Sequence, residues 1–235
     1  MNTKEKTSLW FKITKKDQYL ATNDLILESQ ETPDYYIFLV FSSIIISAGL
    51  LLANSAILIG GMLITPLLTP LLSVGLGITI GNFRLIEKST LMILKSIAII
   101  FSISLIASLI FSVPQNQEFF NSALFNNRIE AAFLYFLVAF ASGIGATFAW
   151  IRKKTDNTLP GISIAVSLVP PISLVAIWLG SSQFELMRFS LMVFLFNIIG
   201  IVGGSMLLFS MFKFYRSAEE IYETVEKLDR VEIIE

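Results

Sequence analysis

Residues 60–72 read GGMLITPLLTPLL, and this stretch decides what kind of chain this is. It lies in an uncharged run from Tyr35 to Phe83, yet it carries two prolines, Pro66 and Pro70, each preceded by a threonine. Proline removes a backbone donor and collides with the carbonyl of the preceding turn, so a helix here must bend or break. In hydrocarbon the freed carbonyls have no water to bond with. The stretch therefore predicts an interrupted helix inside a membrane.

The composition also indicates a membrane protein. Of 235 residues, 54% are hydrophobic and 15% are charged, and the mean hydropathy is +0.74, which is more apolar than a soluble core of this size requires. The net charge of −1 predicts no nucleic-acid partner. Histidine and cysteine are absent, which excludes disulfides, Cys/His zinc sites, thiol nucleophiles and imidazole acid–base chemistry. We expect no cofactor, no metal and no enzymatic activity.

The apolar runs predict six transmembrane helices. A helix needs about 20 residues to cross the hydrocarbon layer, so the run that ends at Phe83 is long enough for two, with a turn at Ala53–Ser55. Four more runs follow, at 91–113, 131–151, 158–180 and 189–212. The predicted fold class is an all-α integral membrane protein with the lipid bilayer as its first partner.

The basic residues orient these helices. Of the 17 Lys and Arg, only Arg128 and Arg188 fall outside the segments that lie inside if the N-terminus is inside. Such a bias predicts a multi-pass protein of the cell (inner) membrane with both termini cytoplasmic. The predicted organisation is a cytoplasmic or interfacial N-tail (1–34), a first transmembrane repeat (35–112), an external loop (113–130), a second transmembrane repeat (131–212) and an amphipathic cytoplasmic C-tail (213–235). The C-tail suits either self-association in a homo-oligomer, which we expect, or contact with the membrane surface.

The two halves align at an offset of 100 residues without gaps. Gly61 falls on Gly161 and Pro70 on Pro170, and KSTLM at 88–92 falls on RFSLM at 188–192. Three helices per half is an odd number, so the second half would enter the membrane upside down. We therefore predict a 3+3 inverted repeat with a proline-broken second helix in each half, as in many transporters. Compositional self-similarity of membrane helices is the alternative.

A second interrupted stretch, SIAVSLVPPISLV at 163–175, contains the adjacent Pro170 and Pro171. Residues before proline are pushed out of the helical region, so breaks are expected at Thr65, Thr69 and Val169. Helix N-termini at such breaks favour an anion and unwound carbonyls favour a cation. The residues predicted to line a site are Thr65, Thr69, Ser73, Ser163, Ser167, Ser173 and Asn197, with Pro66, Pro70, Pro170 and Pro171 shaping the breaks. The alternative for each single residue is a packing role.

The motifs resemble a known family. AILIGGMLITPLLTPLLSVGLGI at 56–78, TLPGISIAVSLVPPISLVAIWLG at 158–180 and LFNIIG at 195–200 are similar to the prokaryotic membrane family called domain of unknown function 389. The resemblance covers roughly residues 35–212. It implies an integral membrane fold without implying a substrate. Many relatives carry a soluble domain before the helices, for which the 34 residues here are too few.

Two hypotheses follow. The first is a carrier or channel for a small solute or ion, with its site between the two proline-broken helices. The spans carry no charged residue deep in the membrane, so a proton relay is not expected. The second is a non-transporting membrane scaffold with a solid, proline-kinked core.

Overall fold

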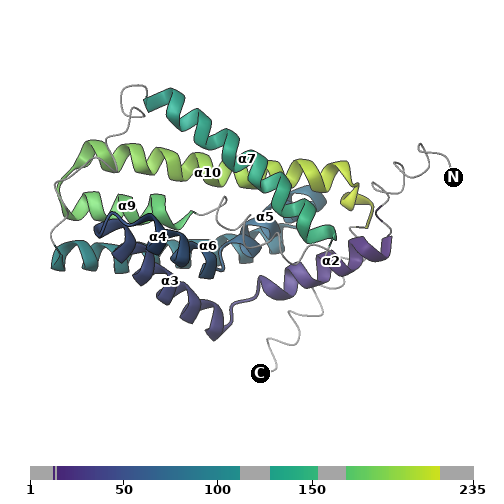
Figure 1. Ribbon diagram of the computed structural model, residues 1–235. Coiled ribbons are helices and arrows are strands. Elements are labelled where there is room, and N and C mark those ends of the chain that lie inside the picture. The colour runs from purple at the N-terminus through teal and green to yellow at the C-terminus, as the bar shows by residue number, and fades with distance from the viewer. Residues whose placement is uncertain (1–12, 14, 112–127, 153–167, 218–235) are drawn as a thin grey trace.

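The computed structural model describes residues 13, 15–111, 128–152 and 168–217 of the chain. Every regular element within these ranges is a helix (Figure 1). The elements are α2 (Lys15–Glu28), α3 (Pro33–Leu51), α4 (Ser55–Ile64), α5 (Leu68–Ile80), α6 (Phe83–Ile110), α7 (Arg128–Arg152), α9 (Val169–Gly180), α10 (Phe184–Met211) and the short 3-10 helix η3 (Phe214–Ser217).

Several of these helices are long and apolar enough to cross a bilayer. They are α3, α6, α10 and residues 131–152 of α7, and α4 with α5 qualify as a bent pair. Helix α9 is apolar but has only 12 residues, and of the predicted run 158–180 the structure describes residue 168 onward. The prediction of an all-helical, multi-pass membrane chain is confirmed, with four to five candidate spans in the described ranges.

The outer faces of the helices carry large apolar side chains. Leu52, Leu109, Ile110 and Phe111 each expose more than 60% of their surface. Leu52, Ile110 and Phe111 also line an apolar groove of about 570 Å³ between α3 and α6. A soluble monomer rarely exposes contiguous apolar surface of this kind, so these faces are suited to contact with lipid.

The predicted turn at Ala53–Ser55 is confirmed. Ala53 adopts a left-handed φ of 50°, and the Asn54 side chain caps α4 by accepting from the backbone amides of Ala56 and Ile57 at 3.0 and 3.2 Å. An added Cβ at Gly49 would lie 2.8 Å from the backbone nitrogen of Leu58. Helices α3 and α4 therefore form a tightly packed antiparallel hairpin.

The predicted break at Thr65 is confirmed, whereas the one at Thr69 is wrong. Helices α4 and α5 meet at an angle of 54° across residues 65–67, and Thr65 has an extended ψ of 123°. Thr69 and Pro70 instead lie in the first turn of α5. Proline is tolerated there because the missing N–H would have no acceptor within the helix.

The same reason explains the second proline pair. Helix α9 begins at Val169, with Pro170 and Pro171 in its first turn, so Val169 lies within the helix and the predicted break there is not tested by the described residues. Its N-cap, Leu168, is the first described residue after the gap at 153–167. What precedes α9 therefore lies outside the described residues.

Helices α6 and α10 begin earlier than predicted and have 28 residues each. At 1.5 Å per residue each is ~42 Å long, well beyond the ~30 Å hydrocarbon thickness. The apolar runs predicted only the part of each helix within the lipid. The exposed Arg84 lies in the first turn of α6, and the exposed Glu185 and Arg188 lie in the first turns of α10. Water or headgroups can reach these charged residues there.

Helix α10 packs on α5, α7 and α9, and α6 packs on α3, α5 and α9 (Figure 1). Glycines allow the closest approach, between α7 and α10. A Cβ added to Gly200 would lie 2.9 Å from the carbonyl oxygen of Phe136, and one added to Gly204 would collide with the carbonyl oxygen of Phe140.

Helix α2 is an element that the sequence analysis did not anticipate. Although it lies in the predicted N-tail, its Ala21 and Leu25 are almost fully buried, and it packs on α5, α7 and η3. The Trp150 indole of α7 donates to the Ala21 carbonyl at 3.0 Å, and the Gln18 side chain donates to the Phe212 carbonyl at 2.7 Å. The N-terminal segment is thus joined to the helical bundle. The remaining parts of both predicted tails, 1–12, 14 and 218–235, lie outside the described residues.

Candidate functional site

The break between α4 and α5 leaves helix ends inside the bundle. The Thr65 hydroxyl donates to the Gly61 carbonyl at 3.1 Å, and the Thr65 amide donates to the Met62 carbonyl at 3.4 Å. On the other side of the break, the N-cap residue of α5 is Leu67, which offers no side-chain cap. Helix ends need partners for their terminal amides and carbonyls, so this break is a place where an outside polar group can be accommodated.

A cavity of about 400 Å³ opens beside the break, and we call it the break cavity. Thr65, Pro66 and Thr69 form one wall, and Trp150 of α7 lies in another. Leu68 lies beside them, and the rest of the lining comes from residues 27–38, where α2 ends and α3 begins. Three of the predicted site residues are therefore brought together here, beside a segment that the sequence analysis had placed in the N-tail.

The break cavity carries acidic charge. Glu28 and Asp34 are in its lining, which contains no Lys or Arg among the described residues. Burial raises the pKa of the Glu28 carboxyl above its ordinary value, because a partly desolvated carboxylate loses hydration.

Two predicted lining hydroxyls are engaged by α2 and the residue that follows it. The Thr69 hydroxyl donates to the Glu28 carbonyl at 3.2 Å, and the hydroxyls of Ser73 and Ser29 lie 2.6 Å apart. Ser73 is fully buried. These hydroxyls therefore hold the N-terminal helix against the first turns of α5.

A second cavity of about 280 Å³, which we call the α9 cavity, is lined by three further predicted residues. Pro170 and Pro171 line it from α9, Asn197 lines it from α10, and Met62 lines it from the last turn of α4. Leu168, the N-cap of α9, gives that helix no side-chain cap. Both cavities adjoin the end of α4, since Met62 lines one and Thr65 lines the other.

The remaining predicted residues are not in either lining. Ser173 is fully buried, and its hydroxyl has no hydrogen-bond partner among the described residues. Ser163 and Ser167 lie outside the described residues. The predicted set is thus divided between two cavities and does not line one shared pocket in the described part of the chain.

A buried row of serines on α6 was missed by the sequence analysis. Ser89, Ser96, Ser104 and Ser108 are all buried. Their spacings of seven, eight and four residues place them on one helix face, a signal that could have been read from the sequence. The Ser104 hydroxyl lies 2.8 Å from that of Ser47 on α3, so the row helps to join these two helices.

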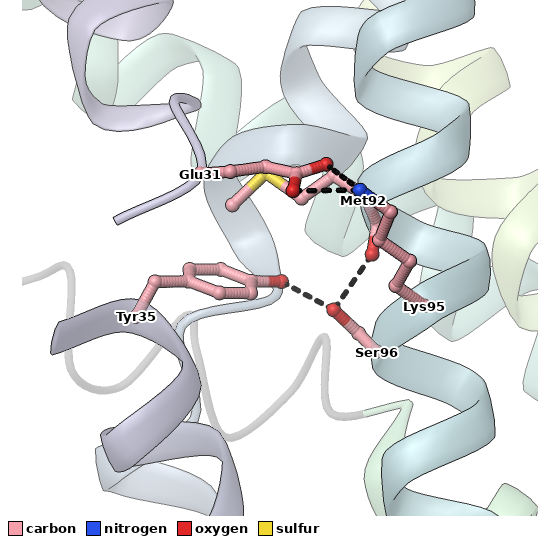
Figure 2. A network of polar contacts seen from close by, with 5 residues as sticks. All are labelled: Glu31, Tyr35, Met92, Lys95 and Ser96. Carbon is pink, nitrogen blue, oxygen red and sulfur yellow. Dashed lines mark hydrogen bonds and ion pairs between the residues drawn. The ribbon is translucent and has the colours of Figure 1, made fainter. Parts of the chain in front are cut away.

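Figure 2 shows the polar end of this contact. The Tyr35 hydroxyl lies 2.8 Å from that of Ser96, which also donates to the Met92 carbonyl at 2.8 Å. Nearby, the Lys95 ammonium forms an ion pair with Glu31 at 2.7 Å. Both charged groups are partly exposed, so the pair contributes little to stability. The network positions the start of α3, which forms part of the break cavity.

Comparison with known proteins agrees with the motifs. The family described as Domain of unknown function (DUF389) matches residues 62–203, which include α5, α6, α9, most of α10 and the residues around both proline motifs. The relative named "Uncharacterized protein MJ0678", from Methanocaldococcus jannaschii, is 25% identical over 201 residues, which are 86% of this chain and 60% of that protein. The chain thus spans 60% of the length of this curated relative. No solved structure matches.

Proposed function

This chain belongs to the family described as Domain of unknown function (DUF389), and from that membership and the geometry above we propose that it carries or conducts a small solute or ion across the membrane. The observation that carries the proposal is the broken α4–α5 segment with two cavities adjoining the end of α4. Interrupted helices with polar residues at the break form the sites of many transporters. The site would comprise the break and both cavities, and the proposal includes no enzymatic step.

The proposal includes a six-span, 3+3 inverted repeat. Its support is that α5 and α9 occupy corresponding places, since each packs on both α6 and α10. The turns after them are alike: the backbone amide of Asn82 donates to the Gly77 carbonyl and that of Gln183 to the Trp178 carbonyl, each at 2.9 Å. Helices α6 and α10, which follow these turns, have equal lengths. The sixth span would be residues 158–180, and both termini would be cytoplasmic.

Flux across vesicles tests this function. The full chain would be reconstituted in proteoliposomes, and the entry of glycerol, urea and potassium chloride would be followed by stopped-flow light scattering. We expect at least one solute to enter faster than into protein-free vesicles. The double variant Thr65→Val with Asn197→Leu should return that rate to the protein-free value. Ser102→Ala is the matched control, because this exposed hydroxyl bonds only the Ala98 carbonyl of its own helix.

A non-transporting scaffold is the second candidate, and one observation favours it. The hydroxyls of Thr69 and Ser73 are used to hold α2 and Ser29 against α5, as in a packed core. The scaffold predicts that no tested solute enters faster than into protein-free vesicles, although the reconstituted protein keeps its helical circular dichroism. That result would remove the transport proposal.

A further inference from the structure

We propose that the α9 cavity is a binding site for a small, uncharged solute that both donates and accepts hydrogen bonds, held by Ser190 and Asn197 of α10. This inference rests on the proposed function, because it names the class of solute that the transport site would take. Sequence reasoning singled out Asn197 but not Ser190.

The first observation is a pair of available polar side chains. Ser190 is only 5% exposed, it lines the cavity, and its hydroxyl has no hydrogen bond within the described residues. Asn197 lies seven residues later on the same helix face and also lines the cavity. Asn197 is only partly buried, so a solute in the cavity can reach both side chains, and hydrogen bonds to this hydroxyl and carboxamide would add to its affinity.

The second observation is the chemistry of the walls. The phenol of Tyr135 adds a further donor and acceptor, while Pro171, Leu174 and Val193 provide apolar surface. The volume of about 280 Å³ is just below the ~300–1,000 Å³ of pockets for drug-sized ligands. The site therefore suits a solute of a few heavy atoms with a polar end and an apolar side.

The third observation concerns charge. No Asp, Glu, Lys or Arg is in the described lining of the α9 cavity, unlike the break cavity with Glu28 and Asp34. An anion would be held by amides at the start of α9, but Pro170 and Pro171 in that turn have no N–H. A cation would lack a carboxylate. A neutral solute incurs neither cost.

Thiol labelling tests this inference without measuring transport. The chain has no cysteine, so Ser190→Cys creates its only thiol, with nearly the original size. The variant, in lipid nanodiscs, would be treated with neutral methyl methanethiosulfonate and with its trimethylammonium-ethyl and sulfonatoethyl analogues. Each rate would be divided by that of Ser55→Cys, an exposed position at the first residue of α4. We expect the neutral reagent to react at least about tenfold faster than either charged one, because an unpaired charge is costly to desolvate.

Glycerol at molar concentration should also slow the neutral reagent at Ser190→Cys, but not at Ser55→Cys or at the lipid-facing Ser102→Cys. Charged reagents that match the neutral one, or glycerol without protection, would overturn the inference. Asn197→Cys provides the same reading if Ser190→Cys fails to fold, as judged by gel filtration. If the thiol reacts faster with the neutral reagent and glycerol protects it, but the vesicles show no flux, then the binding site is retained and the transport proposal is rejected. If the vesicles show flux but the neutral and charged reagents react equally fast, then transport is retained and this binding site is rejected.

Discussion

At the scale of single residues, the break cavity acquires its character from carboxyl groups that the sequence analysis did not select. Glu28 ends α2 and lines the cavity with Asp34. Burial raises the pKa of Glu28 above the ordinary 4.5. Among the predicted lining residues that the structure describes, Thr65 alone both caps its own helix end and faces a cavity. Thr65 thus satisfies a carbonyl at the end of α4 and also contributes to the site.

The raised pKa of Glu28 predicts a pH-dependent stability. The folded state binds the proton of this carboxyl more tightly than the unfolded state does. The stability associated with this group is therefore complete below pH 4.5 and is lost as the pH rises through the folded-state pKa. Glu28→Gln should raise the Tm relative to the wild type at pH 7 and leave it unchanged near pH 4. Glu87→Gln, at an exposed position on α6, is the control; an equal Tm gain for Glu28→Gln at both pH values would contradict this account.

At the scale of elements, small residues decide how the long helices pair. Helix α10 approaches α7 most closely where Gly200 and Gly204 face the backbone of α7. Lipid tails are as apolar as the helix surfaces, so the hydrophobic effect does not drive the helices together. Van der Waals contact between closely packed backbones must hold them instead. Gly60 and Gly145 face open space instead, although the sequence pattern does not distinguish them from the packed glycines.

Gly204→Ala should therefore destabilise the protein more than Gly145→Ala. The Cβ at 204 would collide with the backbone of Phe140 on α7, whereas the Cβ at 145 meets nothing within 4 Å. The overpacked variant should lose about 1–3 kcal/mol. The other should be neutral or gain up to roughly 1 kcal/mol from helix propensity. Thermal denaturation in detergent measures both, and equal effects would show that the α7–α10 contact is looser than described.

At the scale of the whole molecule, the contacts predict which helix ends share a side of the membrane. Gly180, at the end of α9, lies against Ser108 near the end of α6. Gly75 of α5 lies against Ser205 near the end of α10. The start of α10 therefore lies at the same end of the bundle as the end of α6, as an inverted pair of three-helix repeats requires.

Single-cysteine labelling of membrane vesicles tests this topology. An impermeant thiol reagent should modify Ser55→Cys and Ser182→Cys from the same side, and Phe83→Cys from the opposite side. All three positions are exposed at helix ends, and the absence of native cysteine makes the cysteine-free wild type the blank. Labelling of Ser182→Cys from the side of Phe83→Cys would mean that the run 158–180 does not cross, and the six-span proposal would fail.

The sequence by itself determined the membrane class, the turn at Ala53–Ser55, the break at Thr65 and the family. These features depend on local properties, namely apolar run length, proline geometry and short motifs. Only the tertiary structure decided that Thr69 lies within α5, that α2 packs into the bundle and that the predicted lining residues are divided between two cavities. The reason is that a hydroxyl bonds whichever neighbour the packing brings to it. Thr69 and Ser73 meet Glu28 and Ser29 from more than forty residues away, which no local pattern records.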